Sequence, residues 1–123
     1  MFRVQVQADH DASPVDEGMR FLLFESVREL LLNAAKHSGA AEAHVSMVRT
    51  AEGWTKIVVE DKGRGFDPAA VQARHLSDGG FGLSSIRRRL VHMGGGLEIE
   101  SAPGRGTRVI LLSPLGQAGS PVQ

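Results

Sequence analysis

Fifteen glycines constrain this 123-residue chain more than any other feature of its sequence. Average usage of about 7% would give roughly nine. The glycines gather at residues 63 and 65, at 79–82 and at 94–106, each time beside a run with regular apolar spacing. Glycine in such places marks sharp turns, helix ends and close backbone approaches. The clusters therefore separate short structural elements and do not form flexible linkers.

The spacing of apolar residues between these glycines predicts strands and helices in alternation. A long helix should run from about Asp16 to His37, and a second from Leu83 to Met93, with a weak helix at 68–76. The first strand should have one buried face and lie at an edge or at the N-terminus, because apolar and polar residues alternate in it. Strands are expected at residues 2–7, 43–49, 54–60, 97–101 and 107–112.

These elements favour an α/β (α+β) fold. The last four strands form two hairpins, so we expect a two-layer α/β sandwich in which a mixed, mostly antiparallel sheet is covered by helices on one face. The length is that of one domain. We therefore expect a single folded domain over residues 1–114 and a disordered tail over 115–123.

Charge and composition exclude several kinds of partner. Fourteen Lys and Arg residues balance fourteen Asp and Glu residues, so neither nucleic acid nor direct membrane contact is expected. The apolar runs are too short for a membrane span, and the start lacks the pattern of a secretion signal. The chain has no cysteine, which excludes thiolate chemistry and fits a cytoplasmic location.

Four polar side chains should share one face of the long helix: Glu29, Asn33, Lys36 and His37. At 100° per residue the last three fall within about 80° of Glu29. A solvated helix face would explain such a cluster. Asparagine, however, is a poor helix former with no local reason to lie mid-helix. A carboxylate, an amide oxygen and a cation side by side suit a hydrated Mg²⁺ and a phosphate tail.

Two glycine-rich loops form the other candidate sites. Asp61-Lys62-Gly63-Arg64-Gly65-Phe66 follows a strand, and its carboxylate and glycines would let a flat ligand approach the backbone, although an ordinary turn has the same composition. Gly79-Gly80-Phe81-Gly82-Leu83 opens the second helix, where backbone N–H groups can hold an anion. This loop is neither a dinucleotide fingerprint nor a P-loop, since Ser85 replaces the third glycine and no Gly-Lys-Ser or Gly-Lys-Thr occurs.

In this order, the segments resemble the histidine-kinase-like ATPase family, which includes sensor kinases, type II topoisomerase ATPase subunits, heat-shock chaperones and mismatch-repair ATPases. Residues 29–37 are similar to the family's asparagine box, and 61–66 and 80–83 to its two glycine boxes. Gly104-Arg105-Gly106-Thr107 is similar to its closing segment. The resemblance runs from about Phe21 to Pro114. It is strongest to the nitrate-sensor and membrane-fluidity-sensor subgroup of sensor histidine kinases, whose short ATP lid would be Pro68 to Gly79.

The resemblance implies a role for each matching residue. Asn33 would coordinate Mg²⁺, and Glu29 would orient water or act as a general base. Lys36 and His37 would hold phosphate oxygens. Asp61 would accept a hydrogen bond from the adenine amino group. The other cofactor-binding residues would include Gly63 and Gly65, which let the base lie close to the backbone, and Gly80 and Gly82, at the lid hinge and the phosphates. Thr107 would support Asp61 or a water molecule at adenine. The box residues Phe66, Phe81 and Leu83 complete the set.

The implied function is the ATP-binding catalytic domain of a sensor histidine kinase, which binds Mg-ATP and transfers the γ-phosphoryl group to a histidine on a separate dimerisation domain. Few residues precede the long helix, so that phosphoacceptor domain is expected to be absent from this chain, and the isolated chain to be at most a weak ATPase. A response regulator would be an indirect partner. A stand-alone anti-sigma-factor-type serine kinase and a non-catalytic nucleotide-gated binding module stay open as alternatives.

Overall fold

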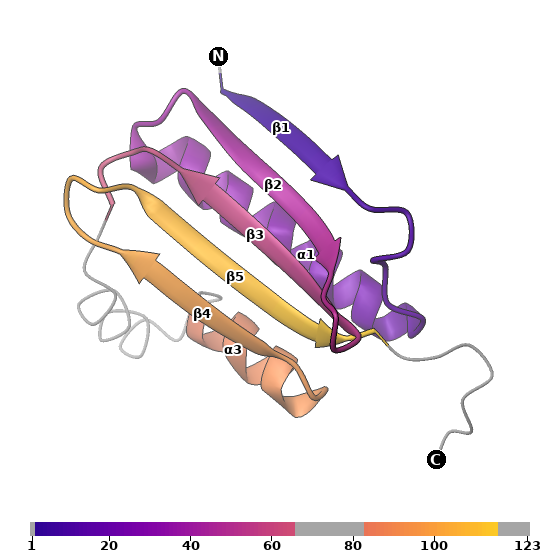
Figure 1. Ribbon diagram of the computed structural model, residues 1–123. Coiled ribbons are helices and arrows are strands. Elements are labelled where there is room, and N and C mark those ends of the chain that lie inside the picture. The colour runs from indigo at the N-terminus through magenta and orange to yellow at the C-terminus, as the bar shows by residue number, and fades with distance from the viewer. Residues whose placement is uncertain (1, 66–82, 116–123) are drawn as a thin grey trace.

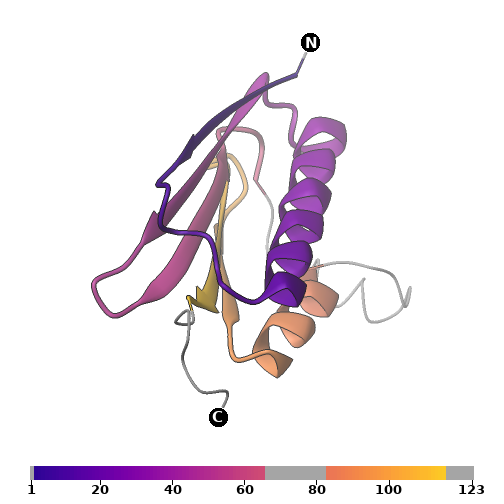
Figure 2. The same cartoon turned by 90° about the vertical axis from the view of Figure 1, so that its right-hand side faces the viewer.

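The chain folds into a two-layer sandwich, shown in Figure 1 by a computed structural model that describes residues 2–65 and 83–115. Five strands form one mixed sheet in the order β1-β2-β3-β5-β4. Helices α1 and α3 lie on the same side of it (Figure 2). The predicted fold class is confirmed. The elements are β1 (Arg3–Ala8), α1 (Glu17–Asn33), η1 (Ala34–Ser38), β2 (Glu42–Arg49), β3 (Trp54–Asp61), α3 (Leu83–His92), β4 (Gly96–Ser101) and β5 (Thr107–Pro114).

Several expectations fall outside the described residues. They are the weak helix at 68–76, the ATP lid at 68–79 and residues 116–123 of the expected tail. Leu115, also assigned to the tail, is 7% exposed. Its N–H donates to the Gly53 carbonyl and its carbonyl accepts from the Val15 N–H. Leu115 therefore packs against the end of the sandwich.

Helix α1 begins at the residue that the sequence predicts. Asp16 caps it, because its carboxylate accepts a hydrogen bond of 2.7 Å from the Met19 N–H, one of the donors that a helix start leaves unpaired. Met19, Leu23 and Leu30 recur at helical spacing and turn inward against the sheet. The helix thereby presents one apolar stripe to the core and carries the candidate site at its far end.

The prediction of one regular α-helix as far as His37 is wrong in its last turn. After Asn33 the chain continues as the π-helical segment η1, which ends at Gly39 in a left-handed conformation with φ of 75°. A π-helix bonds each residue to the fifth along the chain and not to the fourth, so it advances by a smaller angle per residue. The 100° wheel therefore places Asn33 correctly relative to Glu29 but not Lys36.

Both predicted hairpins are present, and they set the register of the site. β2 and β3 pair antiparallel, as do β4 and β5, while β3 and β5 join the two hairpins, also antiparallel. β1 is the one parallel neighbour among the described strands, paired with β2. The end of β3 and the turn between β4 and β5 therefore lie at the same end of the sheet (Figure 1).

The expectation of a buried face on the first strand is wrong. β1 is an edge strand as predicted, but all six of its residues are exposed, including Val4 at 41% and Val6 at 68%. These two valines pair in register with the buried Ala43 and Val45 of β2, and so share the helix side of the sheet. The helical layer covers β2 and the central strands but leaves this edge open to solvent.

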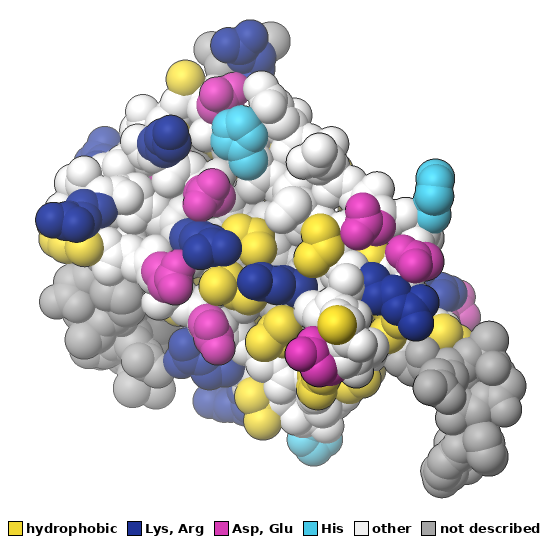
Figure 3. Space-filling model, in the orientation of Figure 1, with side chains coloured by type: hydrophobic (Ala, Val, Ile, Leu, Met, Phe, Trp, Pro, Cys, Tyr) yellow, Lys and Arg dark blue, Asp and Glu magenta, His cyan; other side chains and the backbone are white. Residues whose placement is uncertain are grey.

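The core lies between the sheet and the two helices. Leu90 of α3 and Leu111 of β5 are completely buried at its centre. The opposite face of the sheet has no helix over it among the described residues, and Figure 3 shows basic, acidic and apolar side chains mixed across it. There Arg108 lies between two acidic neighbours, 3.8 Å from Glu60 and 3.3 Å from Glu100. The side chains of Asp61 and Thr107 lie on the other face of the sheet, toward the helical layer.

Candidate functional site

The end of α1 carries the first part of the site. Glu29 and Asn33 are one turn apart in regular helix, so their side chains lie on the same face, and both are half-buried. Asn33 makes no side-chain capping hydrogen bond to η1. Asparagine at this position therefore has no capping role that would explain it. Lys36 is exposed, and His37 follows it within η1.

Asp61 forms the second part, at the last position of β3. It is 9% exposed, and its Oδ1 accepts a hydrogen bond of 2.8 Å from the Gly63 N–H. Its register partners are Ala43 on β2 and Thr107 on β5. Because side chains alternate along a strand, Asp61 shares the helix side with the buried Val59, while Glu60 points to the open face. The carboxylate is thus held on the same side of the sheet as α1.

The loop after Asp61 packs backbone to backbone against the turn between β4 and β5. A Cβ on Gly65 would lie 2.1 Å from the Ala102 carbonyl oxygen, and a Cβ on Gly106 would lie 2.4 Å from the Asp61 carbonyl oxygen. The Gly104 N–H donates to the Arg64 carbonyl. Both packed glycines also have positive φ, 67° at Gly65 and 77° at Gly106. This junction needs glycine at both positions for the fold itself.

The two parts of the site meet beside Gly39. A Cβ on Gly39 would lie 3.5 Å from Nη2 of Arg64, so the loop after Asp61 touches the residue that ends η1. The end of α1, with Glu29 and Asn33, therefore lies at the same end of the molecule as Asp61 (Figure 1). The structure thus places the end of η1 and the loop after Asp61 beside each other.

Thr107 lies beside Asp61 in a row of side chains that crosses three strands. Its Oγ1 is 2.9 Å from Oγ of Ser101, its register partner on β4. Ser101 Oγ also donates to the Gly106 carbonyl at 2.9 Å. Sequence reasoning missed Ser101, because a serine in a strand carries no chemical signature until the register shows its neighbour.

The second glycine box is described only at its last residue. Leu83 starts α3, is half-buried and packs against the core. The candidate residues Phe66, Gly80, Phe81 and Gly82 lie outside the described residues.

The donor atoms of the described site suit Mg²⁺ better than a transition metal. Within residues 2–65 and 83–115, no group of three or more His, Cys, Asp or Glu side chains could hold a metal ion. Glu29 and Asn33 offer one carboxylate and one amide oxygen on the same helix face. Mg²⁺ keeps most of its water and takes one or two protein oxygens together with substrate phosphates. The residues present fit that requirement.

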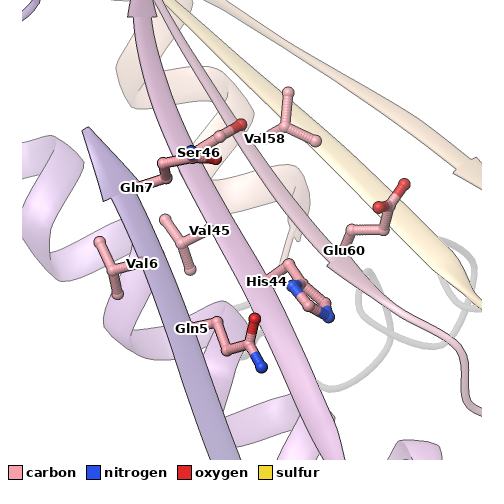
Figure 4. A pocket seen from close by; sticks show the side chains of 8 residues that line it. All are labelled: Gln5, Val6, Gln7, His44, Val45, Ser46, Val58 and Glu60. Carbon is pink, nitrogen blue, oxygen red and sulfur yellow. The ribbon is translucent and has the colours of Figure 1, made fainter. Parts of the chain in front are cut away.

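A hollow of about 370 Å³ lies elsewhere, on the open face near β1. Figure 4 shows side chains of β1, β2 and β3 around it, among them Gln5, His44 and Glu60. It contains none of the candidate site residues.

The fold and the site define the class of protein. Residues 18–117 match the family of histidine kinase-, DNA gyrase B- and HSP90-like ATPases, and the chain belongs to this family. Domains of this family bind ATP, usually with Mg²⁺. The match spans both helices, η1 and strands β2 to β5.

Sensor histidine kinases are among its relatives, so the predicted resemblance is confirmed. An uncharacterised sensor-like histidine kinase of Chloroflexus aurantiacus is 38% identical over 93 residues, which cover 76% of this chain and 16% of the relative. Sensor histidine kinase NarS of Mycobacterium tuberculosis is 38% identical over 112 residues, which cover 91% of this chain and 25% of the relative. The histidine kinase domain of the Erythrobacter litoralis EL346 blue-light activated histidine kinase superposes with a TM-score of 0.72 at 27% identity, over 93% of this chain and 55% of that one.

The chain thus spans a quarter or less of the length of these two curated relatives. None of the helices in the described part of the chain is long and apolar enough to cross a bilayer.

Proposed function

We propose that this chain is the ATP-binding catalytic domain of a sensor histidine kinase, which binds Mg-ATP and transfers the γ-phosphoryl group to a histidine on a separate dimerisation domain. The observation that carries the proposal is the placement of Asp61, buried on the helix side of the sheet, at the same end of the molecule as Glu29 and Asn33. The kinship with sensor histidine kinases supports it. A cytoplasmic location and an indirect response-regulator partner belong to the same proposal.

Asp61 would recognise the adenine base. An ionised carboxylate has only hydrogen-bond acceptors, so it matches the amino group of adenine and opposes the carbonyl oxygen at the same place in guanine. The Gly63 N–H already holds Oδ1, which fixes the orientation of the carboxylate before a base arrives. Gly63 would let the base lie close to the backbone, together with Gly65, which also joins the loop to the hairpin. Thr107, beside Asp61, would complete this edge of the base site.

The end of α1 would hold the triphosphate. Asn33 would supply an oxygen ligand to Mg²⁺, which when bound neutralises charge on the phosphate oxygens. Glu29, one turn earlier, would orient a water molecule or remove a proton from the acceptor. Lys36 and His37 would donate to phosphate oxygens. The remaining residues of the two glycine boxes would complete the nucleotide-binding site: Phe66, Gly80, Phe81, Gly82 and Leu83. Catalysis would rest on positioning and charge neutralisation.

A phosphotransfer assay tests the proposal. The chain is incubated with γ-labelled ATP, Mg²⁺ and separately supplied dimerisation domains of sensor histidine kinases, with Asn33→Ala as the inactive control. We expect acid-labile phosphate on the supplied domain and none on the chain itself, because the acceptor must approach the γ-phosphorus in line from outside.

The other outcomes decide between the alternatives. Stoichiometric phosphohistidine on the isolated chain would contradict a separate acceptor. Acid-stable phosphoserine on an added anti-sigma-factor antagonist would instead support the serine kinase. Tight Mg-ATP binding without transfer to any acceptor would support the nucleotide-gated binding module.

A further inference from the structure

The hydroxyl groups of Ser101 and Thr107 form a cross-strand pair beside Asp61. Thr107 is the register partner of both residues, of Asp61 on β3 and of Ser101 on β4. Directly opposite side chains on neighbouring strands have Cβ atoms about 4.5–5.5 Å apart and lie on the same face. The three side chains therefore form one row on the helix side of the sheet, where Asp61 is buried and the two hydroxyl residues are half-buried.

The hydrogen bonds of Ser101 determine the direction of the bond between the two hydroxyls. Ser101 Oγ lies 2.9 Å from the Gly106 carbonyl oxygen, and a carbonyl can only accept, so Ser101 uses its hydrogen there. A serine hydroxyl has one hydrogen. The 2.9 Å distance between Ser101 Oγ and Thr107 Oγ1 is compatible with either donor, and the bond from Ser101 to the Gly106 carbonyl assigns that donor to Thr107. The single hydrogen of Thr107 points toward β4, away from Asp61.

We propose that Ser101 is a positioning residue for base selectivity: it holds the Thr107 hydroxyl so that Thr107 presents only lone pairs to the nucleotide base. This inference rests on the proposed adenine site at Asp61. With Thr107 oriented in this way, the row offers two acceptors, one from the carboxylate and one from the hydroxyl. Two acceptors side by side suit the 6-amino group of adenine, which has two hydrogens, and oppose a 6-oxo group.

Removal of the Ser101 hydroxyl should relax this selectivity. In Ser101→Ala the Thr107 hydroxyl loses its acceptor and can rotate to donate to a 6-oxo base. The affinity for inosine 5′-diphosphate, whose base carries a 6-oxo group, should then rise relative to that for ADP. We expect the ratio of the affinity for ADP to the affinity for inosine 5′-diphosphate to fall roughly threefold to tenfold, which corresponds to the free energy of one neutral hydrogen bond.

The experiment measures dissociation constants for ADP and inosine 5′-diphosphate in Mg²⁺ by calorimetry. The proteins are the wild type, Ser101→Ala, Thr107→Val and the double variant. Because Ser101 acts through the Thr107 hydroxyl, Ser101→Ala should leave the ratio unchanged when Thr107 is already valine. Ser101→Thr restores the hydroxyl and should restore the wild-type ratio. If the role of Ser101 were merely structural, its substitution would weaken the binding of both nucleotides equally and leave the ratio of affinities unchanged, with either threonine or valine at position 107.

The outcomes separate this inference from the proposed function. A wild type that binds both nucleotides equally would overturn the adenine site at Asp61, and with it this inference. A selective wild type whose ratio is unchanged in folded Ser101→Ala would overturn the role of Ser101 alone. If Ser101→Ala does not fold, Ser101→Cys keeps the side-chain shape but offers the Thr107 hydroxyl a much weaker acceptor. An unchanged ratio in that variant would overturn the role equally.

Discussion

Replacing Gly65 by alanine should destabilise the domain far more than replacing Gly104, although both glycines have positive φ, 67° and 81° respectively. A Cβ on Gly65 would lie 2.1 Å from the Ala102 carbonyl oxygen and 2.8 Å from the Gly106 carbonyl oxygen. A Cβ on Gly104 would meet no heavy atom within 4 Å. The two variants share the cost of the left-handed conformation and differ in the close approach, so Gly104→Ala is the matched control.

The structure sets the size of the difference. A left-handed conformation costs alanine about 1–2 kcal/mol, of which about 0.4–1 kcal/mol is offset because alanine also restricts the unfolded chain. Gly104→Ala should therefore cost about 1 kcal/mol. In Gly65→Ala the Ala102 carbonyl must also move away by about 1 Å, which strains the turn and pulls on the bond from the Gly104 N–H to the Arg64 carbonyl. Backbone strain of about 1–3 kcal/mol and a lost hydrogen bond of about 1 kcal/mol bring the total to roughly 3–5 kcal/mol.

Urea unfolding monitored by the fluorescence of Trp54, the single tryptophan, measures both free energies of unfolding. We expect a lower urea midpoint for Gly65→Ala, by roughly 1–2 M at a typical slope, and a shift of less than about 1 M for Gly104→Ala. Equal destabilisation by the two substitutions would refute the reasoning, because the loop after Asp61 would then not pack backbone to backbone against the hairpin.

Three further substitutions test other parts of the molecule. Asn33→Ala should weaken ATP binding by roughly tenfold in Mg²⁺ and hardly at all in EDTA, and calorimetry showing equal loss in both would remove Asn33 from the metal site. Leu90→Ala should lower the free energy of unfolding by about 2–5 kcal/mol, because Leu90 is fully buried. Val91→Ala, the control at a side chain that is 59% exposed, should lower it by less than about 0.5 kcal/mol. Similar values for the two variants in urea unfolding would contradict a core centred on Leu90. Glu60→Gln should cost less than about 1 kcal/mol, since its ion pair with Arg108 is exposed, and a larger loss that persists in high salt would contradict this.

Local sequence signals predicted most of the fold. Asp16 before an apolar-periodic segment predicts the start of α1, and Gly39 predicts the end of the helical segment that continues as η1, because capping and left-handed termination depend on the residue itself. The π-helical turn between them could not be predicted, since it shifts a hydrogen bond by one residue without a marked change in composition. Val4 and Val6 alternate as in a half-buried strand, but their exposure depends on how far the helical layer reaches across the sheet.

The candidate site was predictable to a similar extent. Glu29, Asn33 and Asp61 could be named from the sequence, because carboxylates and amides beside glycines or in mid-helix are chemically conspicuous. Ser101 could not, because its relevance follows from a register that pairs it with Thr107. Gly65 and Gly106 were expected to approach a ligand or close a turn. Their mutual packing across two hairpins is a tertiary contact that no local pattern encodes.

The central claim is that the site at Asp61 and Asn33 binds Mg-ATP, and calorimetric titration of the chain with ATP tests it most directly. The wild type should bind ATP at one site, more tightly with Mg²⁺ than in EDTA, and in preference to GTP by roughly 1–3 kcal/mol. Asp61→Asn, which keeps the shape but adds a donor, should lose most of that preference. Absence of saturable ATP binding, or equal affinity for ATP and GTP in the wild type, would contradict the account.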